Sequence, residues 1–132
     1  MAVPLPDYAK PLLDGRTVVT LATLNEDGSP HASPVWAARD GDDVLLSTLV
    51  GRQKERNLRR DPRVSIVAVN PENPYEYAEI RGTAALSPDG ARELVEQLSQ
   101  KYTGGAYTND GPGDERVTVR VTPEHVTGMG MR

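Results

Sequence analysis

Short runs of β-branched and aliphatic residues, separated by turn residues, most constrain what this chain can fold into. Residues 17–24 form such a run, and Asn-Glu-Asp-Gly at 25–28 is typical of a hairpin turn. Because the next runs follow after only a few residues, the first three are predicted to pair as a meander. The full set of predicted strands is 17–24, 30–39, 44–48, 63–69, 77–86 and 115–122, with a short final one at 125–129.

Two prolines restrict how the second of these strands can pair. Pro30 and Pro34 have no amide hydrogen, so they cannot donate a hydrogen bond to a neighbouring strand. At least part of the 30–39 strand is therefore predicted to be an edge or bulged. Backbone groups near residues 33–36 are then available to meet something other than a strand.

The helices are predicted to be few and short. Residues 5–14 hold at most a short helix, interrupted by Pro11. Ser87 is predicted to cap a second helix, whose apolar residues at 91, 94, 95, 98 and 102 pack on the sheet and have no predicted role in a site. A Gly-rich loop from 103 to 114 follows, and we expect it to be mobile and able to act as a lid.

The composition allows a single domain, residues 1–132, of the mainly β class. The chain is 37% hydrophobic, with one Trp and no Phe, so its core must be built from Val, Leu, Ala and Ile. A shared subunit interface would help such a core. There is no Cys, and the two histidines lie far apart in the sequence, so we expect no disulfide and no metal site.

Neither the distribution of apolar residues nor the net charge suggests a membrane or nucleic-acid partner. The first residues lack the basic and apolar regions of a signal peptide, and no apolar run approaches the ~20 residues of a membrane span. We therefore expect a cytoplasmic, soluble protein. A net charge of −4 and a pI near 5.1 argue against binding to nucleic acid.

One segment departs from this acidic balance. Between residues 51 and 63 there are six basic and two acidic residues, a local charge of +4. A predicted strand ends just before it with Ser47 and Thr48, and Arg52 and Lys54 lie at the start of a predicted short helix. Free N–H groups at a helix start and two cations favour an anion, and we interpret this turn as a phosphate site.

The same segment also has a simpler interpretation. Glu55 and Arg59 have the i,i+4 spacing of a helix-surface ion pair. Arg59, Arg60 and Arg63 are therefore better read as a solvated face. Arg52 and Lys54 differ, because cations in a first helical turn oppose the helix dipole and a bound anion would explain them.

Several short motifs occur in an order that resembles a known family. They are Leu-Ala-Thr-Leu-Asn-Glu-Asp-Gly-Ser-Pro-His-Ala-Ser-Pro-Val-Trp at 21–36, Asp-Gly-Asp at 40–42, the basic segment at 51–64, Asn-Pro-Tyr at 73–75 and Glu-Ile-Arg-Gly at 79–82. Together they resemble the pyridoxamine 5'-phosphate oxidase-like proteins, and within these the branch of small oxidoreductases that depend on the deazaflavin coenzyme F420. The implied fold is a six- to seven-stranded antiparallel split β-barrel with two or three short helices.

The resemblance also implies a homodimer with two equivalent cofactor sites at its interface. The phosphate would be held at the turn, the ring system would lie beside the 33–36 segment, and Asn57 would support the turn. The implied cofactor-binding residues are Ser33, Pro34, Val35, Trp36, Ser47, Thr48, Arg52, Gln53, Lys54 and Asn57. The mobile loop and the strand that begins at Arg116 would approach the neighbouring subunit's site.

The implied reaction is hydride transfer from reduced F420 to a small conjugated molecule such as an enone, a quinone or a tetrapyrrole. Arg56, Arg59 and Arg60 would suit a longer anion than FMN. His31 and Tyr75 are candidate proton donors, although an ordinary strand position is the favoured interpretation of His31. The sequence ends without the Arg and His segment of oxidases that act on pyridoxamine phosphate, which argues against that reaction.

Two alternatives remain open at this point. The first is an FMN-dependent oxidoreductase of the pyridoxamine phosphate oxidase type, with the same phosphate site. The second is a protein that binds a flavin, a deazaflavin or a haem-like ligand without turnover.

Overall fold

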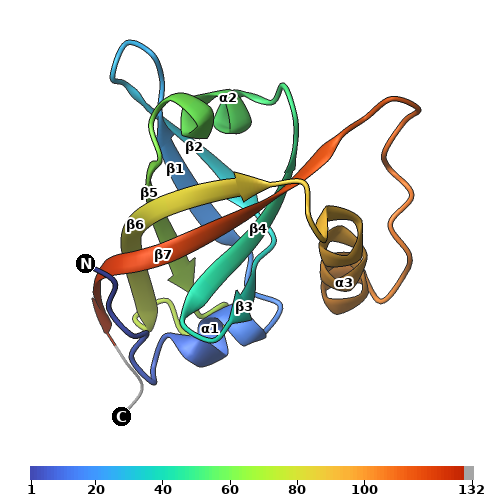
Figure 1. Cartoon of the computed structure of the whole chain (residues 1–132). Coiled ribbons are helices and arrows are strands. Elements are labelled where there is room, and N and C mark those ends of the chain that lie inside the picture. Colours follow the sequence, from blue (N-terminus) through green and yellow to red (C-terminus); the bar gives the residue numbers. More distant parts are fainter. Residues whose placement is uncertain (130–132) are drawn as a thin grey trace.

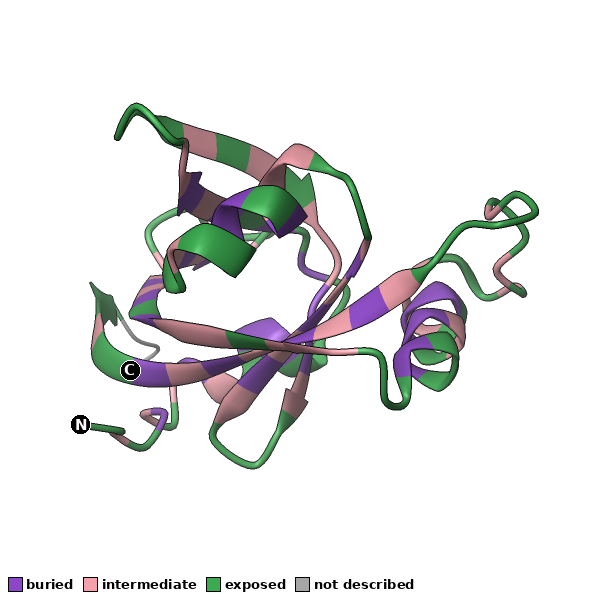
Figure 2. Ribbon diagram, turned by 45° about the horizontal axis from the view of Figure 1, so that its top comes forward, coloured by how far each residue is buried: buried purple, intermediate pink, exposed green. Residues whose placement is uncertain are grey.

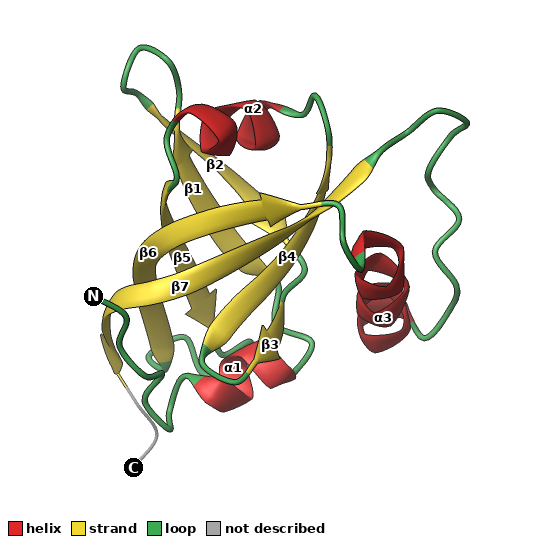
Figure 3. Ribbon diagram, in the orientation of Figure 1, coloured by secondary structure: helices red, strands yellow, loops and turns green. Residues whose placement is uncertain are grey.

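The structure, a computed structural model, describes residues 1–129 as one seven-stranded antiparallel sheet with three helices (Figures 1 and 3). The predicted fold class, a mainly β split barrel, is confirmed. The strands are β1 (Val19–Leu24), β2 (Pro30–Val35), β3 (Ala38–Asp40), β4 (Asp43–Leu49), β5 (Arg63–Val69), β6 (Tyr77–Ser87) and β7 (Arg116–Met129), and the helices are α1 (Lys10–Asp14), α2 (Gln53–Arg60) and α3 (Ala91–Thr103).

The order of the strands, β2-β1-β5-β6-β7-β4-β3, makes β2 and β3 the two edges of the sheet. The single strand predicted at 30–39 is therefore two strands, separated at Trp36 and Ala37, and each edge pairs with its own neighbour. The predicted meander is wrong, because the chain crosses between edges at this break. The prediction that Pro30 and Pro34 lie in an edge strand is confirmed.

The longest pairing joins β6 and β7, which cross the front of the barrel in Figure 1. The two strands predicted at 115–122 and 125–129 are one continuous strand, with a register shift between Arg81 and Gly82 of β6. At Gly82 a Cβ atom would overlap the carbonyl oxygen of Thr122. Close backbone approach therefore explains why glycine stands at the bulge.

The main core fills the barrel with aliphatic side chains. Alternating burial along β1, β4 and β5 places every second residue inside, as a half-buried sheet requires (Figure 2). The helices α1 and α2 cover opposite ends of the barrel (Figure 1). Fully buried members of this core include Leu13, Val19, Leu46, Ile66 and Ile80.

The third helix lies outside the barrel, against β4 and β7 (Figure 1). It begins at Ala91 after Gly90, whose φ of 67° is left-handed, so the predicted cap at Ser87 is wrong. The Ser87 side chain instead accepts a hydrogen bond from the Asp89 amide. In α1, Pro11 lies in the first turn, where its missing N–H costs nothing, and does not interrupt the helix.

The α3 helix packs on a small second core, separate from the first. Its buried members are Ala38, Leu94 and Leu98, with Trp36, Leu45 and Tyr102 packed against them. Within residues 1–129, no helix has the length and apolar character to cross a membrane.

Candidate functional site

A cleft of about 280 Å³ lies where β2, the end of β4, the start of α2, α3 and the following loop meet. One side is basic and polar, and the other is apolar and aromatic. It brings together seven of the ten predicted cofactor-binding residues. Those seven are Pro34, Val35, Trp36, Ser47, Thr48, Arg52 and Lys54, and the further lining residues are Leu49, Val95, Leu98, Tyr107, Asn109 and Arg116.

The turn between β4 and α2 is held by a buried carboxylate. Gly51 has a φ of 97°, which a residue with a side chain would rarely adopt, and its amide donates to Glu55 Oε1 at 2.9 Å. Glu55 is 1% exposed and also accepts from Arg59. These bonds to Gly51 and Arg59 lower its pKa despite its burial, so it remains a carboxylate. The start of α2 is thereby fixed beside the cleft.

Lys54 brings a positive charge into this cleft without a countercharge. Its Nζ donates to Ser33 Oγ at 3.2 Å, so Ser33 touches the site through Lys54. No carboxylate within residues 1–129 forms a salt bridge with it. Burial, and then the neighbouring Arg52 charge, lower the pKa of Lys54. An anion in the cleft would relieve both effects.

The other arginines of the basic segment are engaged elsewhere. Arg59 pairs with Glu55, and Arg63 makes a two-point contact with Asp61, so the solvated-face interpretation of both is supported. Arg60 donates to the Leu24 carbonyl. Arg56 donates to Gly51 O and to Gln53 Oε1. None of these four lines the cleft, so the expectation that Arg56, Arg59 and Arg60 extend the anion site has no support from their placement.

Gln53 and Asn57 also lie outside the cleft. Asn57 is fully buried, and its Nδ2 donates to Thr23 Oγ1 at 3.0 Å and to Asn25 Oδ1 at 2.9 Å. Gln53 Nε2 donates to Asn57 Oδ1 at 2.8 Å. Asn57 therefore joins α2 to the β1–β2 hairpin, consistent with a supporting role for the turn.

The apolar side combines predicted residues with residues that the sequence analysis missed. Trp36 stacks on Tyr102 with ring centroids 5.3 Å apart and an angle of 11° between the planes. Val95 and Leu98 of α3 complete this wall. From the sequence, the helical stripe is predicted only to pack on the sheet, because its spacing is that of any amphipathic helix. The feature of the sequence that could have indicated this wall is Trp36, whose large side chain needs other apolar side chains to pack against.

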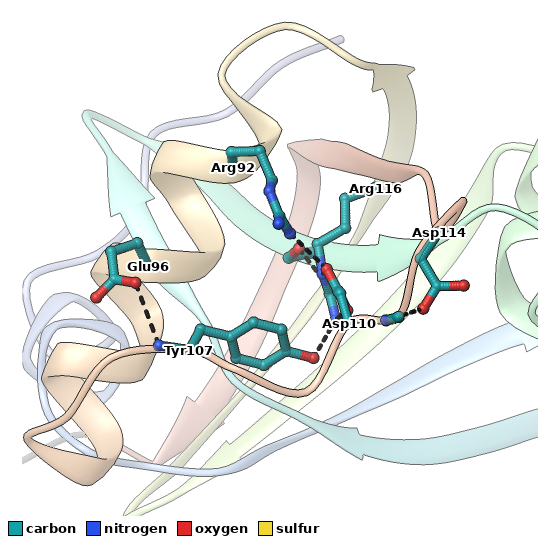
Figure 4. A network of polar contacts seen from close by, with 8 residues as sticks. Arg92, Glu96, Tyr107, Asp110, Asp114 and Arg116 are labelled. Atoms are coloured by element: carbon teal, nitrogen blue, oxygen red, sulfur yellow. Dashed lines mark hydrogen bonds and ion pairs between the residues drawn. The ribbon is translucent and has the colours of Figure 1, made fainter.

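A network of polar contacts closes the third side of the cleft (Figure 4). Arg116, at the start of β7, donates to Ser47 Oγ at 3.0 Å and forms an ion pair with Asp110 at 2.7 Å. It also donates to the Tyr107 hydroxyl. Arg92 of α3 reaches the same Asp110 carboxylate at 2.7 Å. The 104–114 loop is thereby attached to both α3 and β7.

The two candidate proton donors lie elsewhere. Tyr75 is 76% exposed in the turn between β5 and β6, and neither it nor His31 lines the cleft. The tyrosine that lines the cleft is Tyr107, which the sequence does not single out because the loop shows no pattern.

A seven-stranded antiparallel barrel with two unpaired edges, and with a cleft bordered by β2 and β4, defines the class of split-barrel proteins. The chain belongs to the pyridoxamine 5'-phosphate oxidase family, whose family model matches residues 5–130. The resemblance stated from the sequence is confirmed at this level.

Solved structures agree with this assignment. A protein named F420 reductase matches with a TM-score of 0.82 and 32% identity, over 93% of this chain and 98% of that chain. A conserved hypothetical protein from Mycobacterium tuberculosis has a TM-score of 0.75 and 27% identity, over 95% and 84%. General stress protein 26 from Bacillus anthracis, at 0.70 and 17% over 91% and 89%, shows the fold alone.

Proposed function

We propose that this protein is an oxidoreductase that uses the deazaflavin coenzyme F420 to reduce a small conjugated substrate. The observation that carries the proposal is the convergence of Arg52 and the half-buried Lys54, which has no carboxylate partner within residues 1–129, on one side of a cleft whose other side is apolar. The 32% identity to a protein named F420 reductase supports the same choice of cofactor.

The residues present fit such a cofactor. F420 carries a phosphodiester and an acidic tail, and Lys54 and Arg52 supply the cations without a carboxylate partner among residues 1–129. Pro34, Val35 and Trp36 supply an apolar wall for a ring system. When bound, the cofactor supplies the hydride chemistry.

The chain's own residues bind, orient and exclude water. Lys54 and Arg52 hold the anionic portion by charge-assisted hydrogen bonds, and Ser47 lies beside them with Arg116. The wall of Trp36 and Leu98 removes water from the ring and fixes its position, which accounts for the protein's share of catalysis. The resemblance also supports a homodimer whose interface completes each site.

FMN is the second candidate cofactor, because the family name refers to pyridoxamine 5'-phosphate oxidase and an FMN phosphate would meet the same cations. Titration of the purified protein with each cofactor, followed by cofactor fluorescence, separates the two. We expect saturable binding of F420 and a much weaker response to FMN. Tight FMN binding with no response to F420 would contradict the proposal.

Turnover distinguishes an enzyme from a carrier. Members of a panel of enones and quinones should oxidise reduced F420 faster when it is bound to the protein than when it is free in solution. A rate equal to that of the free cofactor for every acceptor would favour a cofactor-binding protein without turnover.

A further inference from the structure

We propose that Tyr102 and Lys101, in the last turn of α3, are positioning residues that set the orientation of Trp36 and thereby the apolar wall of the cleft. Neither Tyr102 nor Lys101 lines the cleft. That the wall faces F420 rests on the proposed function, whereas the contacts among these side chains do not depend on it.

The break between β2 and β3 is the point on which they act. At Ala37, which is fully buried, neither the N–H nor the carbonyl pairs with another strand. Buried backbone groups need partners, and here they find them in α3. The Ala37 amide donates to the Tyr102 hydroxyl at 3.0 Å, and the Ala37 carbonyl accepts from Lys101 Nζ.

The same two side chains reach the first part of the chain as well. The Tyr102 hydroxyl donates to the Thr17 carbonyl at 2.6 Å, and Lys101 Nζ donates to the Leu13 carbonyl at 2.8 Å. The backbone beside Trp36 is therefore connected to α1 itself and to the segment that follows it, and it cannot shift without breaking several hydrogen bonds at once.

Stacking fixes the indole ring directly. The Trp36 and Tyr102 rings are nearly parallel, at 11° with centroids 5.3 Å apart, and Lys101 Nζ lies 4.9 Å from the Tyr102 centroid. Such contacts favour one side-chain orientation over others. Trp36 is thus held through its ring by Tyr102 and through the adjacent peptide by both residues.

The contacts of Lys101 require a charged group to be partly buried, which is unfavourable without a countercharge. Its ammonium is half-buried and forms no salt bridge within residues 1–129, and burial lowers its pKa. Two backbone carbonyls take the place of a carboxylate. The Lys101 ammonium thus satisfies the backbone carbonyl at the gap between β2 and β3. Lys54, in contrast, faces an open cleft.

The first test uses Tyr102→Phe, which keeps the stacked ring and removes the hydroxyl. Trp36 is the only tryptophan, so its fluorescence reports on the wall alone. We expect acrylamide to quench Trp36 more strongly in the variant than in the wild type at a temperature where both are folded. Tyr8→Phe, at a partly buried tyrosine on the main core, is the matched control and should leave quenching unchanged.

The second test is a double-mutant cycle on F420 affinity. Loss of one net hydrogen bond should weaken binding about fivefold in Tyr102→Phe. In a Trp36→Phe background the same substitution should change affinity less than about twofold, because the residue that it positions is gone. Lys101→Met should weaken F420 binding about as much as Tyr102→Phe does. Lys101→Arg, which keeps the positive charge, should keep most of the wild-type affinity.

Equal effects of Tyr102→Phe in both backgrounds would overturn the proposal, since Tyr102 would then only support α3. Unchanged quenching in both Tyr102→Phe and Lys101→Met would also overturn it. If wild-type protein fails to bind F420, the proposed function fails, but quenching still decides whether these residues position Trp36.

Discussion

Arg52 and Lys54 line the cleft and form no salt bridge within residues 1–129. Among the other basic residues between 51 and 63, Arg59 and Arg63 pair with carboxylates, and Arg56 and Arg60 donate to neutral oxygens outside the cleft. Replacing Arg52 or Lys54 with alanine should weaken cofactor binding by about 1.5 to 3 kcal/mol, the range of a charge-assisted hydrogen bond. The stability of the fold should change little, because neither side chain is part of the core.

Isothermal titration of Lys54→Ala and Arg52→Ala measures this effect. Arg63→Ala is the matched control, since Arg63 carries the same charge in the same segment but contacts Asp61. Normal binding by both cleft variants would place the phosphate site elsewhere.

The depressed pKa of Lys54 predicts how cofactor affinity varies with pH. The ammonium form attracts the anion, so affinity is retained below the pKa of Lys54 and declines as the pH rises through it. Because burial lowers this pKa below its ordinary value, the decline should begin at a lower pH than for an exposed lysine. Lys54→Arg should move the decline upward, because a guanidinium stays charged; an identical profile would argue against Lys54 as the anion contact.

Much of the cleft's basic side could be predicted at the level of single residues. Arg52 and Lys54 were distinguished from Arg59 and Arg63 because a cation at a helix start is unfavourable without a ligand, and the structure separates them in the same way. The displacement of Gln53 and Asn57 from the cleft was not predictable, since a helix start does not reveal which of its side chains turn inward.

Among the elements, β6 depends most visibly on one glycine. Gly82→Ala would bring a Cβ against the Thr122 carbonyl, and a backbone atom of a paired strand cannot move aside as a side chain can. We expect a loss of about 1 to 3 kcal/mol in the free energy of unfolding, measured by urea denaturation. Gly105→Ala, where the nearest atom beyond the neighbours is 3.8 Å away, should cause little change.

The loop from 104 to 114 depends on the Asp110 carboxylate between Arg92 and Arg116 (Figure 4). Asp110→Asn leaves the nearly buried Arg116 without its counterion, so we expect a loss of about 1 to 3 kcal/mol in stability and faster proteolysis within the loop. Asp7→Asn is the control, because Asp7 is fully exposed and its pairing with Lys10 is long, at 3.9 Å.

Acid should reproduce the effect of Asp110→Asn. Hydrogen bonds and charge from Arg116 hold the pKa of Asp110 below its ordinary value, so its contribution to stability is complete above the unfolded pKa of about 4. It is lost as the pH falls from there through the folded pKa. The wild-type and Asp110→Asn unfolding curves should therefore converge in acid, and a constant separation would contradict this role.

The elements were predictable where periodicity and turn chemistry agree, as for β1, β5 and the hairpin at 25–28. The division of residues 30–39 into two edge strands was not, because a break at Trp36 and Ala37 looks like continuous strand until Tyr102 and Lys101 are known to take over its hydrogen bonds. The contribution of α3 to the cleft wall was not predictable for the same reason, because it depends on contacts between residues far apart in the sequence.

At the scale of the whole molecule, the outward faces of β1 and β5 remain uncovered although they carry few charges. Val18 is 52% and Val69 39% exposed. Such a surface suits a second copy of the chain, in line with the proposed homodimer. The outward-facing residues are Thr20, Ala22 and Leu24 on β1, Arg63, Ser65, Val67 and Val69 on β5, and Val18 just before β1.

Light scattering should give twice the mass of the chain, and Thr20→Arg should shift it toward the monomer. Thr20 is already exposed, so a monomer tolerates the arginine, whereas a pair of facing sheets would bury two charges. Gln97→Arg, on the exposed face of α3, should leave the mass unchanged. A monomeric wild type that still binds the cofactor would contradict the proposed interface.

The small core beneath α3 is separate from the barrel core, so Trp36 and Leu98 of the cleft wall are packed by side chains other than those that fill the barrel. Val35, on the same wall, packs against the barrel core instead. We therefore expect a substitution at Leu98 to alter the cleft wall more than the packing of the barrel. An exchange of α3 between proteins of this fold would therefore have to keep Tyr102 and Lys101, which join this helix to Ala37, Leu13 and Thr17.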